Sequence, residues 1–400
     1  MKKHFAYFFS VILCLSVHSK ELDSSIDSKP EYLIKNGKFA SAWTEINKNN
    51  NDSSALSVIK KSTFCLKYFS HTSYHLKFYF VDIDSNETLL SYRQKELSTG
   101  ELFASFNPEK ELLKALRKDE SNPELHFALG TYYYDVFLSY HNKWKKGTKE
   151  TMALFYYHFM EAYKQNKKSH LSCYAISYFH QSRRTNAKAK SFLLEALKIN
   201  PKYAAAHYNL AYSYSVEDST ELAITHANEA YKNYEIQSLK AEAASMCGIL
   251  YGDLGKHEDA VNWMLISDAL APGNVMLYET LLTSYLALGK DLEAALIAKN
   301  LYAYDWRTGR VFNSILDAYM AVKKTTALQL FLENEIESEP VDKEYQGFTY
   351  MHLTQMHLNL DQGKQAKENL VKAKASFDIC YDKDHAIYRV LEKLDRTIKK

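Results

Sequence analysis

One pattern of residues returns along this 400-residue chain about every 34 positions. Each copy opens on a small or apolar residue that is followed, four positions later, by another apolar residue. The opening residues, which recur at spacings of 34, 37, 34, 34 and 38, are Ala189, Ala223, Ala260, Ala294, Leu328 and Ala366. Self-similarity at this period is typical of chains built by stacking one supersecondary unit on the next.

A second series with the same spacings runs ahead of the first. Its members are tyrosines or histidines, each four residues after an apolar residue: His180, Tyr214, Tyr251, Tyr285, Tyr319 and His357. An i, i+4 relation places both residues of a pair on one face of a helix. Two series in one register therefore predict two helices in each unit.

Glycine and proline mark the ends of these predicted helices. Gly255, Gly289 and Gly363 are expected to end first helices, because glycine adopts the left-handed conformation that satisfies the last carbonyls. Pro201, Pro272 and Pro340 are expected to stop second helices. The chain has only 12 Gly and 6 Pro. That shortage argues against barrels and sandwiches, which need frequent turns, and against Pro/Gly-rich disorder.

On these residues the chain resembles the tetratricopeptide repeat family. The resemblance implies an all-α fold, an α-α superhelix of antiparallel helix pairs stacked in a single elongated array. Six units are predicted over residues 170–380, at 170–203, 204–237, 241–274, 275–308, 309–342 and 347–380, with short insertions at 238–240 and 343–346.

The regions on either side of the six units are predicted to be helical. Residues 122–169 read as an irregular helix pair and residues 382–400 as a capping helix. The inner face of that cap is expected to hold Ile387, Val390, Leu391, Leu394 and Ile398. Residues 31–120 are interpreted as a helical region, with degenerate repeats as one interpretation of it. Within it, the aromatic segment 62–84 fits a helix or a strand, and helix is favoured because residues 38–99 lack Gly and Pro.

Residues 1–19 have the pattern of a cleavable secretory signal. Lys2 and Lys3 precede an apolar run that is too short for an ordinary membrane span, and Val17 and Ser19 place small residues at the two positions that a signal peptidase reads. We therefore expect a periplasmic or secreted protein, with an uncleaved N-terminal anchor as the alternative, and a polar linker at 20–30. Without residues 1–19 the chain has 48 basic and 48 acidic residues. A neutral chain lacks the charge expected of a general nucleic-acid binder.

No catalytic or cofactor motif is recognised, and we predict a protein that is not an enzyme and binds no cofactor. Gly-rich phosphate loops, HExxH and GxSxG are missing from the sequence. His71 and His75, four residues apart, could share a helix face, but no third metal ligand is evident. Cys173 and Cys247 fall on apolar helix faces and are expected to be buried free thiols.

In the family that the chain resembles, the first helices of successive units line an inner groove. The residues expected there, mostly aromatic, are Phe127, Tyr134, Tyr174, Tyr178, Tyr208, Asn209 and Tyr212. Tyrosine offers a large contact area and one polar group, which suits a binding surface. The alternative is that these rings fill gaps between neighbouring helices. Some members hold the C-terminal carboxylate of a chaperone with Lys, Asn and Arg; here Tyr174, Tyr178, Ala205 and Tyr208 occupy that neighbourhood, so such binding is not predicted.

These observations predict an exported scaffold that binds a segment of another protein in the groove. One alternative is a periplasmic accessory that handles a small solute or lipid, in a pocket between residues 60–165 and the array. Another is an enzyme with its site in residues 50–120. The basic loop at 143–149 is interpreted as solvated, with Trp144 packed against a helix, rather than as a contact for an acidic partner or lipid headgroups.

Overall fold

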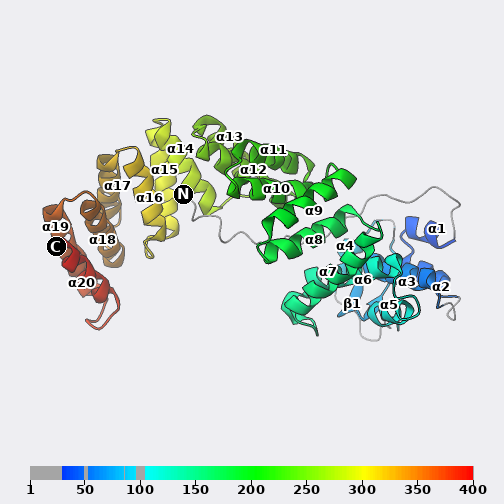
Figure 1. Ribbon diagram of the computed structural model, residues 1–400. Coiled ribbons are helices and arrows are strands. Elements are labelled where there is room, and N and C mark those ends of the chain that lie inside the picture. The colour runs from blue at the N-terminus through cyan, green and yellow to red at the C-terminus, as the bar shows by residue number, and fades with distance from the viewer. Residues whose placement is uncertain (1–28, 49–52, 85, 96–103, 400) are drawn as a thin grey trace. The chain divides into compact units, whose positions relative to one another are not determined.

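The computed structural model describes residues 29–48, 53–84, 86–95 and 104–399, and these residues form helices almost throughout (Figure 1). The predicted signal sequence and most of the predicted linker lie outside them. The chain divides into two compact units, residues 1–210 and 211–400. No helix among the described residues is long and apolar enough to cross a membrane.

The first unit begins with short helices and a two-stranded sheet. Its elements are α1 (Lys29–Lys35), α2 (Phe39–Ile46), α3 (Ala55–Tyr68), β1 (His71–Ser73), β2 (Lys77–Tyr79), α4 (Leu89–Arg93) and α5 (Pro108–Leu116). They are followed by α6 (Pro123–Tyr140), η1 (His141–Lys143), α7 (Thr148–Lys164), α8 (His170–Ser182) and α9 (Asn186–Ile199). The helix α10 (Ala204–Val216) contains the boundary between the units.

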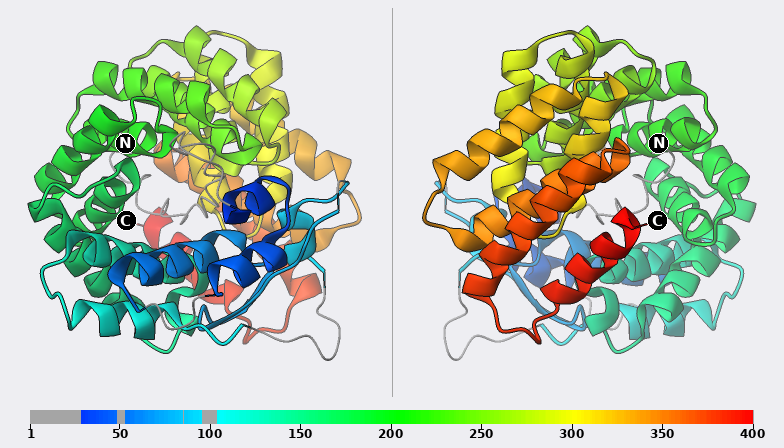
Figure 2. Two further views of the ribbon diagram at one scale, coloured as in Figure 1. Left: turned by 90° about the vertical axis from the view of Figure 1, so that its right-hand side faces the viewer. Right: turned by 90° about the vertical axis from the view of Figure 1, so that its left-hand side faces the viewer.

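Among its described residues, the second unit consists of helices joined by short loops, with no strand. After α10 come α11 (Thr220–Asn233), α12 (Gln237–Asp253), α13 (His257–Leu270), α14 (Val275–Ala287), α15 (Asp291–Tyr304), α16 (Arg310–Ala321), α17 (Thr325–Ser338), α18 (Lys343–Asn359), α19 (Gly363–Cys380) and α20 (Ile387–Ile398). The pairs α12–α13, α14–α15, α16–α17 and α18–α19 pack within themselves, and each packs against the next. Neighbouring first helices also meet, as α12 and α14 do, and α20 packs on both α18 and α19 (Figure 2).

The predicted all-α fold of stacked antiparallel helix pairs is confirmed. The small or apolar residues that open the sequence pattern lie at the fourth position of α9, α11, α13, α15, α17 and α19, and all are at most 1% exposed. Such positions allow the second helix to lie close to the first. The three prolines each follow the last residue of a second helix by two positions, as Pro201 follows Ile199.

The first helices end in a left-handed residue that recurs with the spacing of the repeat. These residues, with φ between 55° and 72°, are Arg184, Asp218, Gly255, Gly289, Lys323 and Asp361. At each end, the backbone N–H that follows donates to the carbonyl of the recurring tyrosine or histidine, as Lys290 N does to Tyr285 O at 2.9 Å. The prediction for Gly255 and Gly289 is confirmed. It is wrong for Gly363, which begins α19, because Asp361 already ends the first helix.

Two further expectations are wrong. The segment 62–84 is helical only to Tyr68 and then forms the β1–β2 hairpin, in which His71 pairs with Tyr79. His71 and His75 therefore do not share a helix face. Val390 does not lie on the inner face of the capping helix, since it is 44% exposed, whereas Ile387 and Leu391 are buried.

Candidate functional site

The predicted groove residues are distributed over three first helices, α6, α8 and α10, and all seven are half-buried. Those of α6 pack against its own pair partner. Phe127 meets Phe159 of α7 edge to face, with 5.7 Å between ring centroids, and Tyr134 meets Phe155 and Phe159 in the same way. Phe159 thus brings Phe127 and Tyr134 together. Much of the area of these two rings is used to hold α6 on α7.

The residues of α8 and the first part of α10 meet through a polar contact. The side-chain amide of Asn209 donates to the hydroxyl of Tyr174 at 3.0 Å and to the carbonyl of Ala205 at 2.9 Å. Gln181, two turns after Tyr174 on α8, donates to Oδ1 of Asn209 at 3.4 Å. Together, Tyr174, Gln181 and Asn209 form a group that we call the amide–phenol cluster.

Tyr178 packs differently from Tyr174. Its ring lies 5.5 Å from that of Phe137 on α6, and burial raises the pKa of its hydroxyl. Tyr208 lies beside Asn209 on α10 in the first unit, and Tyr212 belongs to the second unit. Ring packing between helices therefore accounts for Phe127, Tyr134 and Tyr178 at least in part. Whether the exposed parts of these rings bind a partner stays a prediction.

A second polar group anchors the β1–β2 hairpin, and it is the nearest approach to a catalytic constellation in residues 50–120. His75 is 2% exposed; its Nε2 lies 2.6 Å from a carboxylate oxygen of Asp135, and its Nδ1 lies 2.7 Å from the hydroxyl of Tyr140. A carboxylate only accepts, so Nε2 of His75 donates to Asp135. Both ring nitrogens are therefore engaged by the protein itself, and His75 fastens the hairpin to α6.

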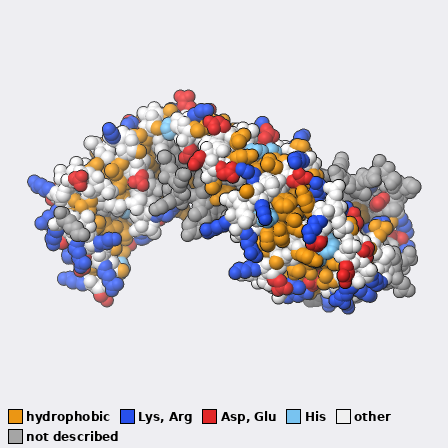
Figure 3. Space-filling model, viewed as in Figure 1, with side chains coloured by type: hydrophobic (Ala, Val, Ile, Leu, Met, Phe, Trp, Pro, Cys, Tyr) orange, Lys and Arg blue, Asp and Glu red, His pale blue; other side chains and the backbone are white. Residues whose placement is uncertain are grey.

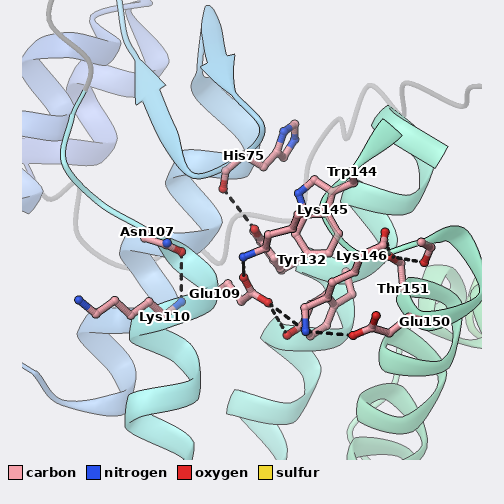
Figure 4. A network of polar contacts seen from close by, with 12 residues as sticks. His75, Asn107, Glu109, Lys110, Tyr132, Trp144, Lys145, Lys146, Glu150 and Thr151 are labelled. Atoms are coloured by element: carbon pink, nitrogen blue, oxygen red, sulfur yellow. Dashed lines mark hydrogen bonds and ion pairs between the residues drawn. The ribbon is translucent and has the colours of Figure 1, made fainter. Parts of the chain in front are cut away.

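The turn that presents His75 is conformationally strained. Tyr74 and His75 both have positive φ, 51° and 53°, at a turn where glycine or asparagine is preferred. Hydrogen bonds from Tyr132 and Trp144 to the carbonyls of the turn compensate for this strain. The hydroxyl of Tyr132 donates to the carbonyl of His75 at 3.3 Å (Figure 4). Nε1 of Trp144 donates to the carbonyl of Tyr74 at 3.2 Å.

The basic loop after α6 is partly neutralised within the chain. Glu109, which is 6% exposed on α5, accepts from Lys145 at 2.6 Å and from the hydroxyl of Tyr133 at 3.0 Å (Figure 4). Lys146 lies 3.8 Å from the same carboxylate. Trp144 is 4% exposed, which confirms that it packs against a helix. Most of the loop is exposed, as expected, but the ion pairs with Glu109 were not predicted.

Buried titratable groups elsewhere contact one another. Nδ1 of His126 lies 2.9 Å from Nδ1 of His158, and Nε2 of His126 lies 3.0 Å from the carbonyl of Glu120. Burial, with a smaller contribution from His126, lowers the pKa of His158 to about 4. Cys65, Cys173 and Cys247 are buried free thiols, which confirms the expectation for Cys173 and Cys247. Among the residues that the structure describes, no three His, Cys, Asp or Glu side chains are grouped to hold a metal ion.

Sequence reasoning missed a surface on α7, α8 and α9. There the rings of Tyr156 and Phe179 stack at 3.8 Å between centroids, and the guanidinium of Arg183 lies 5.1 Å from the centroid of Phe179. The signal that could have found it is local charge. Residues 141–203 contain 13 Lys and Arg but only three Asp and Glu, an imbalance that the neutral total conceals.

Comparison with known proteins finds similar solved structures. No family model matches the chain, and no curated protein matches it either. Among solved structures it is similar to a tetratricopeptide repeat protein from Parabacteroides merdae, at 16% identity and a TM-score of 0.42, over 69% of this chain and 99% of that one.

Two further structures show the same kind of likeness. YrrB, a TPR protein with an unusual peptide-binding site, is 17% identical with a TM-score of 0.38, over 46% of this chain and 93% of its own. The APC/C hetero-tetramer Cut9–Hcn1 matches 90% of this chain and 59% of that one, at 13% identity and a TM-score of 0.38. The first two of these structures are tetratricopeptide repeat proteins by name.

Proposed function

We propose that this protein is a non-enzymatic scaffold that binds a segment of another protein along the first helices α8 and α10. The observation that carries the proposal is the amide–phenol cluster. Amides and phenols donate and accept, as a peptide backbone does, so Gln181, Asn209 and Tyr174 can exchange contacts with one another for contacts with an extended chain. The half-buried rings nearby supply apolar area that is already ordered.

We also propose that the protein is exported, on the pattern of residues 1–19 alone. Mass spectrometry of the protein recovered from its host is expected to give a chain that begins at Lys20. A chain that retains its first 19 residues would contradict cleavage.

Affinity capture from the envelope fraction tests the scaffold. A variant in which Tyr174, Tyr178, Tyr208 and Tyr212 are all replaced by alanine is expected to recover its specific partner less well than the wild type. The matched control replaces Tyr32 and Tyr304, which are 60% and 68% exposed on other helices, and is expected to recover the partner normally. Equal recovery by the wild type and the quadruple variant would contradict binding at these helices.

Four simultaneous replacements of half-buried rings can also lower stability. Asn209→Ala is therefore the second variant, because it removes only the amide at the centre of the cluster. We expect a thermal unfolding midpoint close to that of the wild type and partner affinity reduced by about ten-fold, the loss of one or two good hydrogen bonds. An unchanged affinity in this variant would remove the amide–phenol cluster from the binding surface.

A further inference from the structure

Residues 141–203 carry a large net positive charge, whereas the net charge of the whole chain is close to zero. The segment has ten more basic than acidic residues, whereas the whole chain has a formal net charge of +2. Its three acids are already paired. Glu150 lies 3.3 Å from Lys146, Glu161 lies 2.6 Å from Lys164, and Glu195 contacts both Lys168 and Lys198. The remaining cations of the segment are thus not neutralised by its own carboxylates.

Three of those cations gather where α8 ends and α9 begins. Arg183 and Arg184 follow the last residue of α8, and Lys188 lies in the first turn of α9; all three are exposed. Within the described part of the chain none of them forms an ion pair. Exposed like charges held together in a turn create a local positive potential.

An aromatic pair lies beside these cations. Tyr156 and Phe179 stack with an angle of 11° between their rings, and the hydroxyl of Ser182 contacts the sulfur of Met152 at 3.3 Å. Figure 3 shows hydrophobic side chains gathered over α7, α8 and α9, with Lys and Arg side chains around them. We call Tyr156, Phe179, Arg183, Arg184 and Lys188 the aromatic–basic surface.

This surface is separate from the amide–phenol cluster. Tyr178, four residues after Tyr174 and three before Gln181, shares their face of α8, and Phe179 lies about 100° further round the helix. Tyr178 packs on Phe137 of α6, whereas Phe179 stacks on Tyr156 of α7. The two faces of α8 can therefore be altered independently.

The ring geometry selects the kind of partner. A nucleic acid binds such surfaces by stacking its bases on open ring faces, but here one face of Phe179 is covered by Tyr156 and Arg183 lies over the ring. A membrane-binding surface inserts protruding apolar side chains into the bilayer, but Tyr156 and Phe179 are half-buried. An acidic polypeptide needs only cations for its carboxylates and a flat apolar surface for its aromatic or aliphatic side chains.

From these contacts we infer that the aromatic–basic surface binds an acidic segment of a partner protein that carries aromatic or aliphatic side chains between its carboxylates. The inference rests on the proposed function in one respect, since both take the ligand to be a polypeptide. It adds a second surface and states the chemistry of what binds there.

The test measures the affinity of the intact protein for a defined probe. The probe is a fluorescein-labelled peptide of roughly twelve residues with the repeat Asp-Glu-Phe. Its binding is measured by fluorescence anisotropy at about 50 mM salt. The same peptide with Asn and Gln in place of Asp and Glu is the neutral comparison. We expect the acidic peptide to bind at least about ten-fold more tightly than the neutral one, and to weaken as salt is added.

Charge reversal identifies the surface. R183E/R184E/K188E is expected to weaken the acidic peptide by about ten-fold or more, because it reverses three exposed charges without removing a buried side chain. The matched control K364E/K367E/K372E reverses three exposed lysines on α19 and is expected to bind within about two-fold of the wild type.

Several outcomes would overturn the inference. The first is equal binding of the acidic and neutral peptides, and the second is an unchanged affinity of R183E/R184E/K188E for the acidic peptide. The third is that the protein binds vesicles with roughly 30% phosphatidylserine, or an oligothymidine strand, more tightly than it binds the peptide. Asn209→Ala is expected to bind the acidic peptide normally. If this variant loses the peptide while R183E/R184E/K188E retains it, the peptide binds the amide–phenol cluster, which contradicts this inference and leaves the proposed function standing.

Discussion

At the scale of single residues, the ends of the first helices show how a repeat tolerates different amino acids at one structural position. Two of the six left-handed positions hold glycine, and the others hold arginine, aspartate or lysine. A side chain in this conformation is strained because its Cβ approaches the following carbonyl. The repeat therefore fixes the backbone conformation more strictly than it fixes the residue.

Gly289→Ala is expected to lower the free energy of unfolding by about 1 kcal/mol. Gly289 has a φ of 72°, and a Cβ there would meet no atom within 4 Å, so the whole effect is backbone strain. Gly363 is the matched control: it is equally open but begins α19 without a positive φ. Urea unfolding of both variants checks this. A loss in Gly363→Ala as large as that in Gly289→Ala would contradict the explanation.

The buried histidine pair predicts a pH-dependent stability in the first unit. The folded pKa of His158 is about 4, below its ordinary value of 6.5, so folding favours the neutral form. Its stabilisation is complete above pH 6.5 and is lost as the pH falls through 6.5 towards 4. Between pH 7 and pH 5 the α6–α7 pair is expected to lose about 2 kcal/mol.

Hydrogen exchange of the α6 and α7 amides at the two pH values measures this loss. His158→Gln is expected to be less stable at pH 7 and to lose less on going to pH 5. His385→Gln, a replacement in the chain segment before α20, should retain the full pH dependence in α6 and α7. An equal pH dependence in His158→Gln and the wild type would exclude His158 as the cause.

At the scale of secondary structure elements, close helix contacts depend on glycines that face large rings. A Cβ at Gly347 on α18 would lie 2.7 Å from a ring carbon of Phe377 on α19, and one at Gly130 on α6 would lie 2.5 Å from Phe159 on α7. Each pair therefore fits only because the side chain is missing. The sequence alone does not reveal such a contact, because the partner ring lies on another helix.

Gly347→Ala is expected to lower stability by about 1–3 kcal/mol, because the added methyl displaces Phe377. Gly252→Ala on α12 is the control. Its Cβ would lie at ordinary distances, 3.6 Å from Thr280, so it should gain about 0.5–1 kcal/mol from helix propensity. Thermal unfolding of both variants, and of Gly347→Ala combined with Phe377→Leu, checks the mechanism. Failure of Phe377→Leu to relieve the loss would contradict it.

The helices could be predicted because their signal is local. The recurring alanines, tyrosines and prolines place the second helices and the ends of the first helices from Asn186 onwards. The hairpin could not be predicted in this way. Its strands have three residues each, and its turn holds Tyr74 and His75 where a turn motif would have Gly or Asn. Contacts with Asp135, more than fifty residues away, hold that turn in place.

At the scale of the whole molecule, the two compact units can be followed separately through their cysteines. Cys65 and Cys173 are buried in the first unit and Cys247 in the second, whereas Cys380 is exposed. Burial raises the pKa of Cys173 to about 11 and of Cys247 to about 12, so neither forms much thiolate at neutral pH.

The chain that begins at Lys20 is expected to react with a maleimide at Cys380 alone within minutes, because its other three thiols are both buried and protonated. In increasing urea, Cys65 and Cys173 should become reactive together. Peptide mass spectrometry identifies each labelled cysteine. Fast labelling of Cys173 or Cys247 in native buffer would contradict the burial described here.

The candidate sites were only partly predictable at this scale. The pattern of first helices correctly placed Tyr174 and Asn209 on neighbouring helices, where they form a hydrogen bond. It did not show that Phe127, Tyr134 and Tyr178 pack against rings of neighbouring helices. The aromatic–basic surface was missed because a net charge summed over 400 residues hides a positive segment among negative ones.

The two insertions between repeats have a consequence for how such a chain changes its length. Both are absorbed at the start of a first helix, since α12 and α18 have 17 residues where α8, α10 and α14 have 13. Four residues advance a helix by about one full turn, so the incoming loop still arrives on the same side. An insertion of about two residues would bring the incoming loop to the opposite side of the helix. Viable length variants of this chain should therefore differ at the start of a first helix by about three or four residues, or by about seven.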